Sequence, residues 1–415
     1  MKRHFHYQEN SLFAEEVPLK DIAQQYGTPC FVYSRAAITE KFIQFTNALS
    51  GSSHLICYAV KANSSLAVLN VLAQLGAGFD IVSGGELKRV LAAGGNAEKI
   101  VFSGVGKSAD EIRLALNANI LCFNVESPAE MERLNEIASS MDKVAAISLR
   151  VNPDVDAKTH PYISTGLKQN KFGIAYSDAI ELYRKASTMK ALRITGIDCH
   201  IGSQLTEIDP FISAAEKVLV LADKLSIEGI YLEHIDMGGG LGIKYNDETP
   251  PDITDYVSAL RVIMAGRSEK LLLEPGRALI GNAGILLTRV EYLKHGEEKN
   301  FAIVDAAMND LIRPALYGAY HDILTVQREK HAMQNYEVVG PICETGDFIG
   351  HARSLAIAPQ SLLAIFSTGA YGMSMSSNYN TRPRAAEVMV DGNKMYLIRE
   401  REVAEQLYAA EKIIS

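Results

Sequence analysis

The sequence has few cysteines, no excess of positive charge and no long apolar run, and each shortage excludes a class of protein. Its five cysteines are scattered over 415 residues without a C-x-x-C pair, which is typical of neither a disulfide framework nor a zinc site. With 41 Lys and Arg against 49 Asp and Glu, the net charge of −8 argues against binding to nucleic acid or to an anionic membrane. No stretch approaches the roughly 18 uncharged apolar residues that indicate a transmembrane helix.

The N-terminus also lacks the features of a secretory signal. Charged residues interrupt every short apolar run of the first 20 residues, and no small-residue cleavage site follows. We therefore expect a reduced, cytoplasmic protein without a bound metal. The composition, 47% hydrophobic and 22% charged, is ordinary for a globular chain. At roughly 150 residues per domain, the length allows two or three domains, or one large barrel with an appendage.

Short aliphatic or β-branched runs alternate with helix-like stretches between about residues 54 and 276. There are eight such runs, at 54–60, 78–83, 99–104, 120–125, 145–151, 193–200, 231–238 and 270–275, each with a plausible helix after it. This alternation is typical of parallel βα units, and eight units predict a (β/α)8 TIM barrel. A doubly wound open sheet is the alternative, but it would normally carry G-x-G-x-x-G after its first strand, where this sequence has Lys61, Ala62 and Asn63.

Beyond about residue 280 the hydrophobic pattern changes to a period of two. The runs lie at 285–293, 301–306, 336–342, 354–359, 362–366 and 386–392. They predict a second, mostly antiparallel β domain. We expect residues 1–34 to contribute to this β domain, with a strand at 31–33, residues 35–280 to form the barrel, and residues 281–415 to form the rest of the β domain.

Residues that can take part in catalysis or ligand binding repeatedly follow the predicted barrel strands. They are Lys61, Asp80, Arg150, His200, the glycines at 238–240, and Glu274. The carboxyl ends of all barrel strands open on one face, where barrel active sites lie, so these side chains are expected to gather there. A lone lysine is ordinarily a solvated surface charge. At the end of the first barrel strand, however, desolvation and nearby cations can lower the pKa of Lys61 enough for Schiff-base chemistry.

Glycines occur in the loops after both the seventh and the eighth predicted strand, at 238–240 and at 276, with Arg277 beside the latter. Barrels frequently build a phosphate site from these two loops, although a glycine triplet alone is more often a tight turn. A phosphate site together with a Schiff-base lysine predicts pyridoxal 5′-phosphate (PLP). In that case Glu274 would contact the pyridine nitrogen, His200 would stack on the ring, and Ser203 would reach the phosphate.

Six motifs, taken together and in this order, resemble those of the diaminopimelate decarboxylases. They are YAVKAN (58–63), HIGSQ (200–204), GGGLG (238–242), EPGR (274–277), CETGD (343–347) and GAYGMSMSSNYN (369–380). This family is part of the barrel-type, PLP-dependent group related to ornithine decarboxylase and alanine racemase. The resemblance covers nearly the whole chain. It implies a homodimer that converts meso-2,6-diaminopimelate, at its D-configured centre, to L-lysine and carbon dioxide in the last step of lysine biosynthesis.

The resemblance also implies a role for individual residues. The catalytic set is Lys61, His200, Glu274 and Cys343. The cofactor-binding set is Lys61, Asp80, His200, Ser203, Gly239, Gly240, Glu274, Pro275, Gly276, Arg277 and Tyr371, and Arg150 is similar to a position near the cofactor. The substrate-binding set is Arg277, Arg313, Tyr317, Glu344 and Tyr371. Cys343 corresponds to the proton donor and, with Glu344, is expected to enter the site from the neighbouring subunit.

The distal end of the proposed substrate carries both an amine and a carboxylate. Arg313 can pair with the distal carboxylate and Glu344 with the distal amine. A ligand without that carboxylate would leave a buried arginine unpaired, which costs on the order of 1–3 kcal/mol or more.

Three other functions remain open from the sequence. The first is decarboxylation of another basic or D-amino acid on the same scaffold. The second is a racemase, in which an arginine rather than Glu274 would be expected to face the pyridine nitrogen. The third is a non-catalytic regulatory relative, which can lose the Schiff-base lysine, whereas this chain has Lys61, Glu274 and Cys343.

Overall fold

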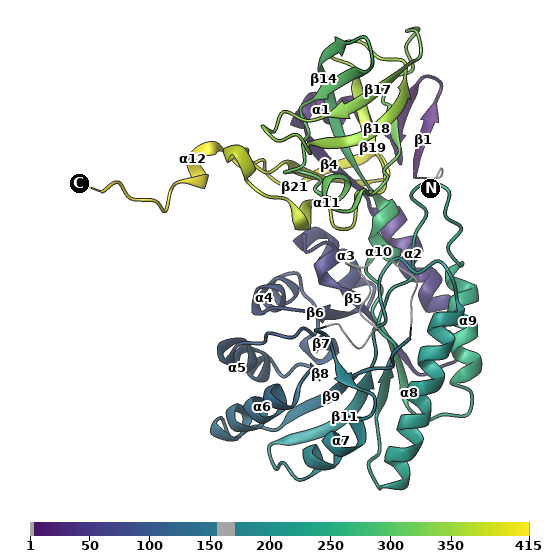
Figure 1. Ribbon diagram of the computed structural model, residues 1–415, viewed down its shortest axis with the longest axis vertical. Helices are drawn as coiled ribbons and strands as arrows, with labels where there is room; N and C mark the ends of the chain where they lie inside the picture. The colour runs from purple at the N-terminus through teal and green to yellow at the C-terminus, as the bar shows by residue number, and fades with distance from the viewer. Residues whose placement is uncertain (1–3, 156–170, 415) are drawn as a thin grey trace. The chain divides into compact units, whose positions relative to one another are not determined.

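The computed structural model describes residues 4–155 and 171–414 (Figure 1). Contacts between residues divide the chain into two compact units. We call residues 41–243 and 248–278 the barrel unit, and residues 1–40, 244–247 and 279–415 the β unit. None of the helices in the described ranges is long and apolar enough to cross a membrane.

Eight parallel strands form the wall of the barrel unit. They are β5 (His54–Ala59), β6 (Gly78–Ile81), β7 (Ile100–Phe102), β8 (Cys122–Val125), β9 (Ala145–Asn152), β11 (Leu192–Asp198), β12 (His234–Asp236) and β13 (Lys270–Leu273), and a short strand β10 (Ile174–Ala175) pairs with the end of β9. Each of the eight pairs with the next in chain order, and β13 pairs with β5, so the sheet closes. The predicted (β/α)8 barrel is therefore confirmed.

Helices follow the strands and lie around the outside of the barrel in Figure 1. They are α3 (Leu66–Gln74), α4 (Gly84–Ala92), α5 (Ala109–Ala118), α6 (Pro128–Ser140), α7 (Ala179–Ser187), α8 (Asp209–Ile227) and α9 (Ile253–Ile263), while α2 (Arg35–Ala48) precedes β5. Serine side chains cap α4, α5 and α6 by accepting a hydrogen bond from the N–H of a glutamate three residues later. The eighth strand departs from the expected pattern, because a four-residue helix, α10 (Arg277–Ile280), and a turn of 3-10 helix, η4 (Gly281–Ala283), follow it in place of a longer helix.

The β unit is built around a mixed, mostly antiparallel sheet. Its strands are β4 (Cys30–Ser34), β14 (Gly284–His295), β15 (Asn300–Val304), β16 (Ile323–Thr325), β17 (Gln334–Val339), β18 (Phe348–Leu355), β19 (Leu362–Ile365), β20 (Ala386–Asp391) and β21 (Lys394–Arg399), with a separate small sheet of β1 (Phe5–Gln8), β2 (Ser11–Ala14) and β3 (Val17–Pro18). Its helices are α1 (Leu19–Tyr26), α11 (Arg313–Tyr317) and α12 (Ala404–Leu407). A second, mostly antiparallel β region is therefore confirmed.

Strand β4 shows why the segment before the barrel joins this sheet. It lies between β14, to which it is antiparallel, and β20, to which it is parallel. Phe31 and Tyr33 belong to one apolar cluster of the β unit, and Cys30 and Val32 belong to the other. Since successive side chains of a strand point to opposite faces, β4 is buried on both sides.

The predicted strand at 354–359 is wrong. The strand in this region is β18, which runs from Phe348 to Leu355 and precedes most of the predicted run. A turn replaces the rest, because the Ala358 N–H bonds the Ser361 hydroxyl and the Ser361 N–H bonds the Ala358 carbonyl. Pro359 inside this turn has no N–H to donate to a sheet.

Candidate active site

Lys61 lies in a turn of 3-10 helix, η1 (Val60–Ala62), that directly follows β5. Its Nζ forms an ion pair with Asp80 of β6. The Asp80 side chain is completely buried, whereas 37% of the Lys61 side chain is exposed. A buried carboxylate thus holds an accessible amine at the end of the first barrel strand.

Glu274 follows β13 and lies among other buried carboxylates. Carboxylate oxygens of Asp198, Asp236 and Glu274 are all within 4.8 Å of one another. Asn124 Nδ2 donates a hydrogen bond to Glu274 Oε1 over 3.4 Å. Burial and the neighbouring Asp236 raise the pKa of Glu274 well above its ordinary value. A cation placed against Glu274 would oppose this effect and favour the ionised carboxylate.

His200 follows β11, and the glycine loop after β12 orients its ring. The Gly239 N–H donates to His200 Nδ1 over 3.2 Å. Because Nδ1 accepts this bond, the proton of the neutral ring lies on Nε2. Burial, together with the positive charge of Arg150, lowers the pKa of His200 well below its ordinary value. The site therefore presents a flat, neutral ring at neutral pH.

The glycine loop packs its backbone directly against two neighbouring loops. A Cβ on Gly239 would lie 2.2 Å from the Glu274 carbonyl oxygen, and a Cβ on Gly240 would lie 2.4 Å from the Gly202 carbonyl oxygen. Gly240 also has a φ of +112°, which strongly favours glycine. Side chains at these two positions would push the loops apart, so the close backbone packing requires both glycines.

Arg277 and Ser203, which the sequence predicts to lie near the phosphate, contact each other in the barrel unit. Arg277 is buried, and its Nη2 donates to Ser203 Oγ over 3.1 Å. Arg150, in contrast, forms ion pairs with Glu126 over 3.0 Å and with Asp198 over 3.8 Å. Its positive charge therefore lies beside two carboxylates of the barrel interior.

Pro275 and Gly276 lie in the barrel unit after β13, and the remaining predicted residues belong to the β unit. Arg313 and Tyr317 are the two ends of α11, and Arg313 is buried. Tyr371 has a φ of +57°, an uncommon backbone conformation for a bulky aromatic residue and one that is often retained at functional sites. These assignments to substrate or phosphate remain predictions.

Cys343 and Glu344 are exposed on a loop of the β unit. The Cys343 N–H donates to Asn380 Oδ1 over 2.9 Å. The Tyr379 hydroxyl donates to Glu344 Oε2 over 3.0 Å. The loop therefore presents a thiol and a carboxylate together at the surface of this chain.

Sequence reasoning did not identify several polar residues inside the barrel. Asn124 and Asp236, which surround Glu274, were not predicted, and neither was Asp198, the partner of Arg150. Asn124 lies within the run CFNV, and Asp198 and Asp236 are the last residues of the runs TGID and HID. Buried polar residues are uncommon and are normally paired, so a polar residue in or at the end of a predicted barrel strand was a usable signal.

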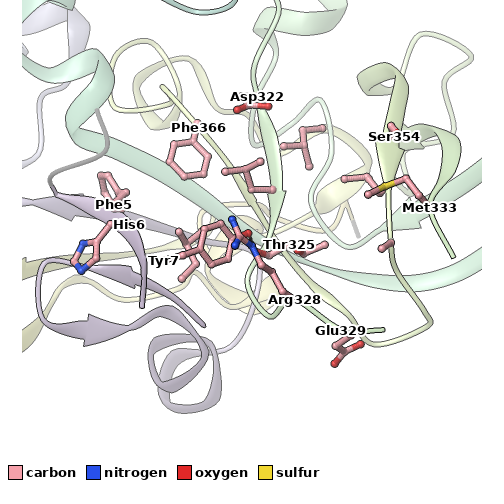
Figure 2. A pocket seen from close by; sticks show the side chains of 15 residues that line it. Phe5, His6, Tyr7, Asp322, Thr325, Arg328, Glu329, Met333, Ser354 and Phe366 are labelled. Carbon is pink, nitrogen blue, oxygen red and sulfur yellow. Dashed lines mark hydrogen bonds between the residues drawn. The ribbon is translucent and has the colours of Figure 1, made fainter. Parts of the chain in front are cut away.

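The β unit also contains a hollow of about 760 Å³, shown in Figure 2. Phe5 and Tyr7 line it from β1, and Leu324 and Thr325 line it from β16. The Arg328 guanidinium lies 3.7 Å from the centre of the Tyr7 ring. Its lining residues include none of those predicted to bind cofactor or substrate.

Comparisons with known proteins identify the family. Residues 35–281 match the family described as pyridoxal-dependent decarboxylase, pyridoxal binding domain. The chain is 58% identical over 410 residues to diaminopimelate decarboxylase of Pseudomonas aeruginosa, and the aligned residues make up 99% of each chain. This chain belongs to the diaminopimelate decarboxylase family. The same enzyme of Neisseria meningitidis is 59% identical over 401 residues, 97% of this chain and 99% of the relative.

A solved structure of this family has the same fold. Diaminopimelate decarboxylase from Helicobacter pylori, complexed with L-lysine, superposes with a TM-score of 0.92 at 42% identity, covering 95% of this chain and 99% of that one. The family is PLP-dependent, and the described residues fit this cofactor. The barrel unit supplies an amine at Lys61, a buried carboxylate at Glu274, a neutral ring at His200 and an Arg277–Ser203 pair beside a glycine loop.

The buried carboxylates should make the free energy of unfolding of the cofactor-free protein depend on pH. Burial raises the pKa of Asp236 to about 7, against an ordinary value of about 3.9. Between these two values the folded protein holds a proton that the unfolded chain has released. The free energy of unfolding should therefore fall as the pH rises from about 4 to 7, by at most about 1.4 kcal/mol per pH unit for this group.

Asp236→Asn should make this decline shallower, as measured by urea unfolding of cofactor-free protein at several pH values. Some decline should remain, because burial also raises the pKa values of Glu86 and Asp310 to about 7. Asp255→Asn, at an exposed position, is the control and should leave the decline unchanged. An equal decline in the Asp236→Asn variant and in the unmodified chain would contradict this account.

Proposed function

We propose that this chain decarboxylates meso-2,6-diaminopimelate at its D-configured centre, giving L-lysine and carbon dioxide in the last step of lysine biosynthesis. The observation that carries the proposal is the likeness to a curated diaminopimelate decarboxylase over 99% of both chains. The geometry of the barrel unit supports it, because the amine of Lys61 and the carboxylate of Glu274 occupy the ends of barrel strands, where barrel active sites lie.

When bound, PLP supplies an electron sink for the pair of electrons released as the Cα–carboxylate bond breaks. Lys61 would hold the cofactor through Nζ. Asp80 keeps the Lys61 ammonium at the barrel mouth. Glu274 would bind the ring nitrogen and favour a proton on it, and His200 would hold the ring from one face.

The proton that replaces the lost carboxylate comes from Cys343 Sγ in this proposal. Cys343 and Glu344 are exposed in the β unit, which suits residues that complete the site of a second copy. We therefore propose a homodimer in which each site combines Lys61 of one chain with Cys343 of its partner.

Recognition of the distal end requires charges of both signs. Arg313, buried at the start of α11, pairs with the distal carboxylate, and Glu344 pairs with the distal amine. All five cysteines are free thiols, which supports a reducing compartment, and we place the enzyme in the cytoplasm.

The first experiment is an absorbance spectrum of the purified protein, followed by addition of meso-diaminopimelate with lysine and carbon dioxide assayed together. We expect the visible band of a PLP Schiff base and equal amounts of the two products. A band without turnover would indicate that the enzyme binds PLP but acts on another amino acid. No band after PLP is supplied would favour a regulatory relative.

A further inference from the structure

Arg313 contacts two side chains that the proposed mechanism does not use. Its Nη1 donates to His321 Nε2 over 2.9 Å, and its guanidinium carbon lies 4.7 Å from the centre of the Tyr245 ring. The rings of Tyr245 and His321 meet edge to face, with their centres 5.3 Å apart. Only 7% of Arg313 and none of His321 is exposed. A buried imidazole and a phenol ring thus hold the guanidinium from two sides.

The hydrogen bonds of His321 determine where its proton lies. Its Nδ1 lies 2.8 Å from the carbonyl oxygen of Phe366. A carbonyl oxygen only accepts, so Nδ1 carries the proton; an arginine only donates, so Nε2 carries none. His321 is therefore neutral in this arrangement. Neither His321 nor Tyr245 brings a carboxylate to Arg313.

The backbone around His321 is anchored independently of its imidazole. Arg353 Nη2 donates to the His321 carbonyl oxygen over 3.0 Å. The Phe366 N–H donates to the Asp322 carbonyl oxygen over 2.8 Å. A change of the side chain at position 321 should therefore affect the orientation of Arg313 more than the path of the chain.

We propose that His321 is a positioning residue for substrate selection. A carboxylate in its place would form an ion pair with Arg313, whereas the imidazole holds the same rotamer as a neutral acceptor and adds no negative charge beside the guanidinium. His321 thereby sets how strongly the enzyme distinguishes ligands with a distal carboxylate from those without one. This inference rests on the proposed function, in which Arg313 pairs with that carboxylate.

Two probes separate this effect from general damage to the site. L-lysine and cadaverine differ by one carboxylate, so the ratio of their Kd values in the PLP-loaded enzyme measures its recognition. His321→Leu should weaken L-lysine binding and raise KM for meso-diaminopimelate by at least about tenfold, the loss expected when a charged hydrogen bond loses its acceptor. Cadaverine binding should stay within about threefold, and kcat should change less than KM.

Two further variants test the chemistry at position 321. His321→Gln restores an acceptor for Arg313 and should recover most of the L-lysine affinity. His321→Asn keeps a donor for the Phe366 carbonyl but loses the acceptor near Arg313, so it should behave like His321→Leu even if the leucine variant fails to fold. Equal losses of L-lysine and cadaverine affinity, or no loss of either in a folded His321→Asn variant, would overturn the inference.

Arg313→Met distinguishes this inference from the function on which it rests. If the unmodified enzyme does not turn over meso-diaminopimelate, the proposed function itself is wrong. If it does, and Arg313→Met loses the preference for L-lysine while the leucine and asparagine variants of His321 keep it, only the role of His321 is wrong.

Discussion

Replacing Lys61 with alanine is expected to lower kcat for meso-diaminopimelate by at least about 10,000-fold, the scale of loss seen when an enzyme loses its covalent nucleophile. The visible Schiff-base band should disappear as well, because no other amine follows β5 at this position. The measurement is single-turnover formation of lysine and carbon dioxide, with an absorbance spectrum of each purified variant.

Alanine at this position also removes the cation that pairs with the buried Asp80. Lys61→Arg is the matched control, because it keeps a positive charge for Asp80 but offers no amine that forms a Schiff base under these conditions. We expect Lys61→Arg to be as inactive as Lys61→Ala while binding Asp80. Lys99→Ala, at a half-buried position whose Nζ donates to the Gly76 carbonyl oxygen, should retain full activity. Activity of Lys61→Ala within tenfold of the unmodified enzyme would exclude the assigned role.

Mixing inactive Lys61→Ala and Cys343→Ala chains is expected to restore about a quarter of the activity of the unmodified enzyme. Random pairing makes half of the dimers mixed, and a site shared across a two-fold axis leaves one of the two sites in each mixed dimer with both residues intact. The measurement is the rate of lysine formation after the chains have exchanged, with exchange followed by two different affinity tags.

The anchoring of the Cys343 loop makes this a test of the shared site rather than of loop folding. Asp347 Oδ1 accepts a hydrogen bond from the Met308 N–H over 2.7 Å, and Oδ2 accepts one from the Ile342 N–H over 2.8 Å. Alanine at the exposed position 343 leaves both bonds in place. A mixture of Lys61→Ala with Lys61→Arg is the negative control and should remain inactive. Proven exchange without recovered activity would mean that Cys343 does not serve the partner's site.

The barrel strands were predictable because parallel strands are buried on both faces and therefore appear as short, continuous apolar runs. The β domain was harder to predict from its sequence. The run that forms β18 contains Gly350, His351 and Arg353, so its alternation is obscured, and the apolar residues after it are drawn into a turn. Apolar pattern alone does not show where a turn ends a strand.

The sequence by itself determined the eight strands of the barrel, the glycines that the loop after β12 requires, and the positions of Lys61 and Glu274 at strand ends, because each depends on local backbone preference and burial. Only the tertiary structure decided which distant side chains meet. Asn124 contacts Glu274, and Arg313 lies between His321 and Tyr245. Such contacts depend on the closure of the barrel and on the pairing of strands in the β unit, and no local property of the residues encodes them.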